Sequence, residues 1–278
     1  MGIWSARFLL QEGFQVVLSD KDEIKLAAVK QEPGIEILSN IEAVQNADVV
    51  LISVSIDSFE EAVQEIAPYV KSNQYVLDIT SIKESPVEVM HRYLKTARIL
   101  GTHPLFGPGA KDLNSQNFVL TPSNPQELEF AEQVQHFLES RGARVTMMSA
   151  REHDEMMAVV LGLAHFISIV SADTLIDLNH LTRMKAIGGS TYRVLSTLVE
   201  SVISEDPELY ATLQMHLPGL AKIEERFQDN AAKWFEYVKN KDKKGFKENM
   251  TALKKKFAKK NSDFGQAYQN MYKIIEWL

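Results

Sequence analysis

The chain has 278 residues, of which 45% are hydrophobic and 24% charged, and its formal net charge is −7 at pH 7. These values are typical of a globular protein large enough for two domains, and the acidic balance argues against nucleic acid as a partner. The absence of cysteine excludes disulfides, thiolate nucleophiles and cysteine-ligated zinc, and favours a cytoplasmic location. We find no apolar run that approaches about 18 residues, so we expect no contact with a membrane.

The first thirteen residues predict a short helix closed by Gly13, and residues 14–20 predict an apolar strand that ends in Asp20. Helix, strand and terminal acid form the second half of a dinucleotide-binding βαβ unit, where the acid accepts hydrogen bonds from the adenosine ribose. Asp20 lies 18 residues after Gly2. This spacing fits the usual distance of about 20 residues between loop and acid if Gly2 is the last glycine of the phosphate loop. We therefore expect Gly2, Ile3 and Asp20 to contact a cofactor.

The first strand of that unit and its first two glycines would precede Met1. This strand is central in a doubly wound sheet and buried on both faces, so a sheet without it is expected to be unstable. Half of a phosphate loop is also expected to bind a dinucleotide weakly. We therefore expect the working protein to carry about ten more residues before Met1.

From residue 22 to residue 148, predicted helices alternate with predicted strands. This alternation predicts an α/β fold with a Rossmann-like, doubly wound, mainly parallel sheet whose first strand is missing. Ligands bind such sheets at the carboxyl ends of the strands. Three segments are expected there, namely Ser53-Val54-Ser55, Ser81-Ile82-Lys83 and His103.

His103 follows the predicted strand 98–101, in a turn that Pro104 and Pro108 stiffen. Proline fixes φ and neighbouring glycines permit close approach of a ligand, so the imidazole would lie on a rigid support beside open space. A neutral imidazole is suited to take a proton from a hydroxyl group. A turn that merely contains a histidine explains these residues equally well.

Strand signals end at Ser149, which predicts a dinucleotide-binding domain at 1–149 and an all-helical domain at 150–278. The long helix predicted at 152–178 is apolar enough to be the centre of a domain or the seam of a dimer. His165 lies on its partly polar face, where a neighbouring helix could satisfy it.

Two further features of the helical domain leave alternatives open. Arg193 has apolar neighbours and would pair either with a structural carboxylate or with a substrate carboxylate. Residues 239–260 hold ten lysines against two acids. Because it lacks interleaved arginines and aromatic stacking platforms, and Met250, Leu253 and Phe257 give it one apolar stripe, we interpret this stretch as a solvated helix face. We find no spacing of potential ligands that predicts a metal site, since His153 and Asp154 are adjacent on a helix.

Five segments occur together in a known order: residues 77–83 (LDITSIK), 101–108 (GTHPLFGP), 149–158 (SAREHDEMMA), 163–166 (LAHF), and 191–193 (TYR) followed by 204–210 (SEDPELY). In these segments and their spacing, the chain resembles the prephenate and arogenate dehydrogenases of tyrosine biosynthesis. The resemblance extends from residue 14 to about residue 215. It implies NAD-dependent oxidative decarboxylation of prephenate to 4-hydroxyphenylpyruvate, without a metal.

The resemblance also implies roles for individual residues. His103 matches the catalytic histidine that accepts the proton of the ring hydroxyl, and Arg193 matches the arginine that holds the ring carboxylate. Ser81 matches a serine that orients the histidine or the hydroxyl. Lys83 and His165 match residues that line the pocket shared by substrate and nicotinamide. Family members bind NAD on the sheet domain and form homodimers through the helical domain.

Several alternatives remain open from the sequence. Asp20 favours NAD over NADP because a carboxylate repels the 2′-phosphate, although Lys21 weakens this preference. Arogenate differs from prephenate only in its side chain and is an equally suitable substrate. A β-hydroxyacid dehydrogenase would use a lysine on the long helix, but residues 150–178 contain none. A non-catalytic dinucleotide sensor is the alternative outside enzymes.

Overall fold

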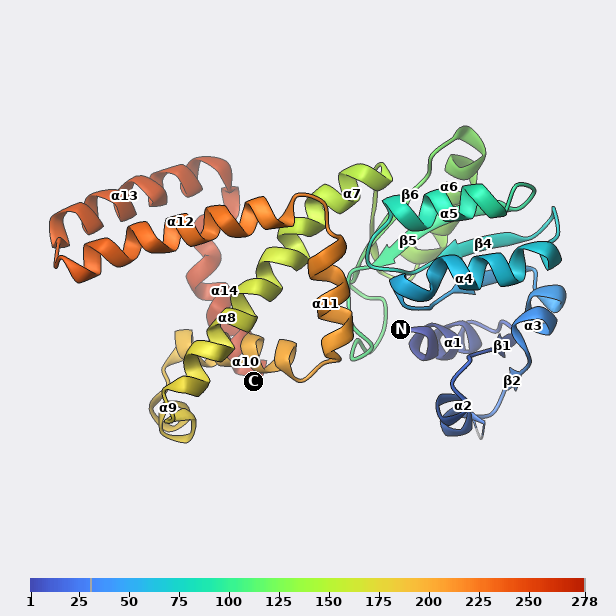
Figure 1. Cartoon of the computed structure of the whole chain (residues 1–278), viewed down its shortest axis with the longest axis horizontal. Helices are drawn as coiled ribbons and strands as arrows, with labels where there is room; N and C mark the ends of the chain where they lie inside the picture. Colours follow the sequence, from blue (N-terminus) through green and yellow to red (C-terminus); the bar gives the residue numbers. More distant parts are fainter. Residues whose placement is uncertain (31, 278) are drawn as a thin grey trace. The chain divides into compact units, whose positions relative to one another are not determined.

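The structure is a computed structural model that describes residues 1–30 and 32–277. The chain forms two compact units, Met1–Met157 and Ala158–Leu278 (Figure 1). The first unit alternates strands and helices, and the second is helical, as the sequence predicts. The sequence analysis puts the domain boundary after residue 149, whereas the two units divide inside the long helix that follows.

The first unit contains a five-stranded sheet of order β3-β4-β5-β6-β7 and a separate parallel pair, β1-β2. All neighbouring strands are parallel except β5 and β6, so the prediction of a mainly parallel sheet is confirmed. The strands are β1 (Val16–Leu18), β2 (Ile35–Ile37), β3 (Val49–Ile52), β4 (Tyr75–Asp78), β5 (Arg98–Pro104), β6 (Asn117–Thr121) and β7 (Arg144–Met147).

The break between the two sheets lies where the sequence analysis finds a strand missing. Among the described residues, β1 pairs only with β2, and β3 pairs only with β4. In a doubly wound sheet, a central strand would connect the edges of β1 and β3. Both edges are open, and Val49 at the start of β3 is 52% exposed.

Helices cover both faces of the five-stranded sheet, because consecutive residues of its strands point to opposite sides. Val76 and Ile99 belong to one buried cluster, with residues of α4 and α5. Their neighbours Leu77 and Leu100 belong to the other, with residues of α6. The helices of this unit before the long helix are α1 (Gly2–Gln11), α2 (Glu23–Val29), α3 (Asn40–Asn46), α4 (Ile56–Ile66), α5 (Glu84–Tyr93) and α6 (Pro125–Glu139), and a 3₁₀ turn spans Ala67–Tyr69.

The prediction that His103 lies in a turn is wrong. Strand β5 continues to Pro104, and His103 is opposite Val119 on the antiparallel strand β6. The pairing with β6 keeps the backbone extended, and Pro104 is tolerated because the pairing of β5 with β4 ends at Gly101. Gly101 serves close packing rather than a turn, since an added Cβ would lie 2.6 Å from Val87 Cγ2. The histidine is therefore mounted on a central strand, which holds it more rigidly than a loop would.

The remaining helices begin with a long one that changes character along its length. It consists of α7, a π-helical segment and α8, and three helices after it are joined by short turns before a long hairpin of α12 and α13. The elements are α7 (Ala150–Met157), the π-helical segment (Ala158–Leu163), α8 (Ala164–Asp177), α9 (Leu181–Ile187), α10 (Ser190–Ile203), α11 (Pro207–His216), α12 (Leu220–Lys239), α13 (Lys243–Lys260), a 3₁₀ turn (Ser262–Gln266) and α14 (Ala267–Trp277).

The expectation that no apolar run could span a membrane needs correction. The helix Ala150–Asp177 has 28 residues, and its most apolar window has a mean hydropathy of 1.9. By length and composition alone, this helix could cross a membrane. The sequence shows no continuous apolar run of this length because uncharged polar residues such as His165 and Ser168 interrupt it. Only 11% of the window is buried within one chain, so most of its side chains are partly or fully exposed there.

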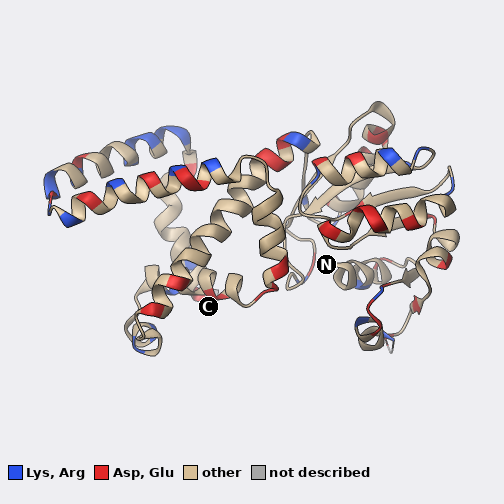
Figure 2. Cartoon of the chain, in the orientation of Figure 1, with Lys and Arg blue, Asp and Glu red and all other residues tan. Residues whose placement is uncertain are grey.

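Lysines gather on α13 (Figure 2). Every lysine of this helix is exposed, as predicted for a solvated basic face. The apolar residues on the same helix, Met250 and Phe257, are 58% and 51% exposed. They are therefore also uncovered within one chain.

Candidate active site

Three predicted segments lie at one edge of the five-stranded sheet. Strands β3, β4 and β5 are adjacent and parallel, so their carboxyl ends meet at the same edge. The exposed segment 53–55 follows β3, residues 81–83 follow β4, and His103 is the next-to-last residue of β5. The strand order therefore brings together segments that are up to fifty residues apart in the sequence.

His103 is the first of three buried groups that are connected by hydrogen bonds. Its Nδ1 lies 2.8 Å from Nε2 of His153, and Nδ1 of His153 lies 2.7 Å from Oδ1 of Asp154. His103, His153 and Asp154 are only 4%, 0% and 3% exposed. The two histidine rings meet edge to face with centroids 5.0 Å apart. Strand β5 and helix α7 are thus joined through a chain of polar side chains.

Asp154 also fixes the start of α5. Its Oδ1 accepts a hydrogen bond from the backbone N of Lys83 at 2.7 Å, and its Oδ2 accepts one from the backbone N of Glu84 at 2.9 Å. A carboxylate at a helix N-terminus satisfies backbone donors that lack an intrahelical partner. With the ring of His153 as the third donor, Asp154 accepts hydrogen bonds from three N–H groups.

The sequence analysis missed His153 and Asp154 as site residues. It considered them only as metal ligands and dismissed them because adjacent residues of a helix point in different directions. The structure shows that they need no common target, since Asp154 binds the ring of His153 itself. The available signal was the segment 149–158, which the resemblance includes.

Lys83 is fully buried and forms an ion pair with Asp78. Its Nζ also donates to Thr80 Oγ1 at 3.1 Å and to the carbonyl oxygen of Thr102 at 2.7 Å. An ammonium group has three donors, and these acceptors use all of them. Lys83 therefore ties β4 to β5 next to His103, and we no longer expect it to contact a ligand directly.

The surroundings of His103 favour its neutral form. Burial lowers the pKa of His103 well below its ordinary value of 6.5, and the charge of Lys83 lowers it further. Within the described residues, Nε2 of His103 has no hydrogen-bond partner. A neutral imidazole with an unoccupied nitrogen has what a general base requires.

Ser81 lies near this group but is not joined to it. It is half-buried, and in residues 1–30 and 32–277 no hydrogen bond connects it with His103. Its orienting role stays a prediction.

His165 and Arg193 belong to the second unit, which is described here by itself. The ring of His165 meets that of Tyr210 edge to face, with centroids 4.6 Å apart, and its buried Nδ1 has no hydrogen-bond partner among the residues that the structure describes. Burial lowers the pKa of His165. Arg193 is exposed on α10 and forms no ion pair with any described carboxylate. Its convergence with His103 on one substrate stays a prediction.

The residues predicted to hold a dinucleotide fit such a ligand in their local geometry. An added Cβ on Gly2 would lie 3.0 Å from Ser53 Oγ, so the start of α1 packs directly on the segment after β3. The first turn of α1 holds no acidic side chain that would repel a phosphate. Asp20 is exposed beyond the end of β1 and accepts one hydrogen bond, from the backbone N of Asp22. Contact of Gly2, Asp20 and Ser53 with a cofactor stays a prediction.

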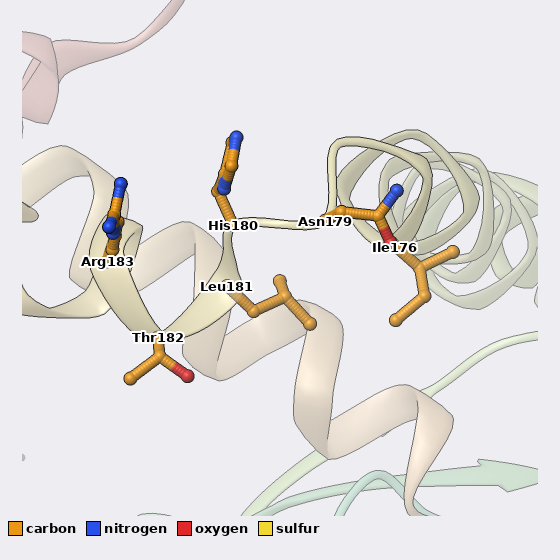
Figure 3. A pocket seen from close by; sticks show the side chains of 6 residues that line it. All are labelled: Ile176, Asn179, His180, Leu181, Thr182 and Arg183. Carbon is orange, nitrogen blue, oxygen red and sulfur yellow. The ribbon is translucent and has the colours of Figure 1, made fainter.

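A surface depression of about 410 Å³ lies at the turn between α8 and α9 (Figure 3). None of the predicted site residues lines it, and most of its residues are exposed. We therefore do not regard it as the candidate site. Its lining is Ile176, Asn179, His180, Leu181, Thr182 and Arg183.

Two family models match the chain in succession. Residues 5–147 match the nucleotide-binding domain of prephenate dehydrogenase, and residues 149–252 match the dimerization domain of prephenate dehydrogenase. The chain belongs to the prephenate dehydrogenase family. The two models meet at the end of β7, which is also where the sequence analysis divides the chain.

Individual relatives agree with this family membership. The chain is 35% identical over 261 residues to a Methanocaldococcus jannaschii protein named "Probable arogenate/prephenate dehydrogenase", covering 92% of the chain and 58% of the relative. It is 30% identical over 247 residues to the "T-protein" of Haemophilus influenzae, covering 87% of the chain and 60% of the relative. The chain thus spans less than two thirds of the length of these relatives.

Solved structures of the same family share the fold. The prephenate dehydrogenase of A. aeolicus in complex with hydroxyphenyl propionate and NAD⁺ matches with a TM-score of 0.76 and 20% identity, over 94% of this chain and 95% of that one. The Synechocystis arogenate dehydrogenase matches with a TM-score of 0.67 and 17% identity, over 91% of this chain and 94% of that one.

Proposed function

We propose that this chain catalyses the NAD-dependent oxidative decarboxylation of prephenate to 4-hydroxyphenylpyruvate. The observation that carries the proposal is His103, a neutral base on the end of β5 at the ligand-binding edge of a nucleotide-binding domain. Arogenate is the second candidate substrate, because relatives in the family carry that name. The exposed carboxylate of Asp20 supports NAD over NADP.

In the proposed reaction a proton, a hydride and carbon dioxide leave the substrate, and the proton returns to the product. Nε2 of His103 takes the proton of the ring hydroxyl as its carbinol carbon is oxidised to a ketone. Bound NAD would accept the hydride from that carbon. The ring carboxylate leaves as carbon dioxide, and the electron pair of the broken carbon–carbon bond enters the ring. The carbonyl oxygen thereby becomes a phenolate, which takes the proton back from His103 to give the phenol. Aromatisation drives the reaction, so the protein must supply a base, an anion-binding group and alignment.

The direct test is the absorbance at 340 nm when the purified chain is mixed with NAD and prephenate. Growth that requires prephenate, together with formation of 4-hydroxyphenylpyruvate, is the expected result. The same assay with arogenate and with NADP assigns the substrate and the cofactor. Binding of NAD without turnover of either substrate would contradict the proposal and favour a dinucleotide sensor.

Arg193→Ala is expected to raise KM for prephenate by about 10- to 100-fold, because hydrogen bonds to charged groups contribute about 1.5–3 kcal/mol. Its kcat should change much less, since an arginine that held the carboxylate more tightly in the transition state would oppose its loss. Steady-state kinetics measure both constants. Arg183→Ala, which removes another exposed arginine, is the matched control, and an equal effect of both variants would contradict the role of Arg193.

The proposal includes a homodimer formed through the helical domain. The match of residues 149–252 to a dimerization domain supports it, as do apolar side chains such as Val160 and Ile176, which are 53% and 58% exposed within one chain. Burial of such surface drives association. Light scattering of the full chain in solution, where a monomer mass would contradict the proposal, tests it. We propose a cytoplasmic location and no partner among membranes or nucleic acids.

A further inference from the structure

We propose that His153 and Asp154 act as positioning residues that hold His103 in the one tautomer competent to take a proton. The inference rests on the proposed function for its kinetic consequence, but the tautomer itself is a property of the free protein. It concerns only residues of the first unit.

The donors and acceptors around the three side chains fix where the protons lie. The backbone N–H groups of Lys83 and Glu84 can only donate, so Asp154 receives them as an acceptor. An ionised carboxylate has no donor of its own, and therefore the proton in the contact between Asp154 and His153 belongs to Nδ1 of His153.

The contact between His153 and His103 fixes the position of the next proton. A neutral His153 that carries its proton on Nδ1 offers a lone pair on Nε2. The 2.8 Å contact then requires His103 to donate from its own Nδ1. A neutral His103 with a proton on Nδ1 has its lone pair on Nε2, the nitrogen without a partner in the described residues. His153 and Asp154 thus leave Nε2 as the basic nitrogen of His103.

Four buried ionisable groups lie around His103. The ionisable groups around His103 are Lys83 and His153, with Asp78 paired to Lys83 and Asp154 paired to His153. Burial keeps His103 neutral before the reaction. Once the imidazolium forms, its Nδ1–H donates to His153, which in turn donates to Asp154.

A purely structural role is the alternative. The same contacts would then only attach α7 to β5 and cap α5, and His103 would be free to adopt either tautomer. The two interpretations differ in whether Nε2 of His103 carries a proton. They also differ in the effect of replacing His153, the acceptor for Nδ1 of His103.

The first experiment measures the tautomer without substrate. The full chain is labelled with ¹⁵N-histidine, and long-range ¹H–¹⁵N correlation spectra show which ring nitrogen of each histidine carries a proton. The signals that disappear in His103→Asn assign His103. We expect a protonated Nδ1 and a bare Nε2 at neutral pH. A protonated Nε2, or a mixture of both tautomers, would overturn the proposal whatever the activity.

The second experiment compares two replacements of His153. His153→Leu removes the acceptor, and we expect kcat to fall about 10²-fold, the lower end of what a general base contributes, while KM stays within a factor of about three. His153→Gln places an amide oxygen where the ring nitrogen was and should restore most of kcat and the bare Nε2. His136→Gln changes an exposed histidine on α6 and should alter neither.

Each outcome separates the proposal from its alternatives. Equal kcat for the Leu and Gln variants, with the tautomer of His103 unchanged, would overturn the positioning role. If His153→Leu does not fold, the wild-type tautomer and the Gln variant still decide. A wild-type chain that oxidises neither prephenate nor arogenate contradicts the proposed function, and the spectra would still report whether His153 sets the tautomer.

Discussion

Replacing His103 with asparagine is expected to lower kcat for prephenate oxidation by about 10³-fold, within the range that a general base contributes. Asparagine keeps a donor that can reach Nε2 of His153 but supplies no group that takes a proton near neutral pH. KM and the affinity for NAD should change little, because neither depends on proton transfer. Stopped-flow and steady-state absorbance at 340 nm measure these constants.

Near-normal turnover by His103→Asn would show that another group is the base. Loss of secondary structure in its circular dichroism spectrum would instead indicate a folding defect, and His136→Asn serves as the control for a generic loss of a histidine. The wild-type pH profile gives an independent check. Because the pKa of His103 lies well below 6.5, kcat/KM should be retained at pH 6.5 and fall only at more acidic pH, where the protonated ring cannot accept a proton.

Lys83→Met is expected to destabilise the chain by about 3–5 kcal/mol, because it leaves the carboxylate of Asp78 buried without its counter-charge. The urea-induced unfolding transition of the first unit measures this loss of stability. Lys185→Met is the matched control, since Lys185 and Glu200 form an exposed ion pair and such pairs contribute about 0–1 kcal/mol.

A second change tests the physical reason for that loss. Asp78→Asn combined with Lys83→Met removes both charges and should recover part of the stability, so that the two effects do not add. Because the charge of Lys83 lowers the pKa of His103, the acidic limb of the pH profile should also move to higher pH in Lys83→Met. Equal destabilisation by Lys83→Met and Lys185→Met would contradict the importance of burial.

The helices and strands of the sheet domain could be predicted because the capping residues agree with the periodicity of the apolar residues. Asp22 accepts hydrogen bonds from the first turn of α2, and Asn124 does the same for α6, as expected of residues that cap helices. Gly13 ends α1 with a positive φ. The short strand β2 was missed, since its three residues include an exposed Glu36 and give no apolar run.

The site was less predictable because it depends on contacts between distant segments. The sequence shows Gly101 and Pro104 as turn residues, and only the pairing of His103 with Val119 keeps that segment extended. His153 is fifty residues from His103 in the chain, and no local pattern joins them. Lys83 looks like a ligand-binding cation until Asp78 and Thr102 are seen to enclose it.

The gap between β1 and β3 also affects how the chain behaves in concentrated solution. Backbone N–H and C=O groups along an uncovered strand edge pair readily with any other extended segment. The apolar side chain of Val49 at one of these edges would add to such pairing. Preparations of this 278-residue chain are therefore expected to aggregate edge to edge, and an extended apolar peptide supplied in excess should suppress that aggregation by occupying the edges first.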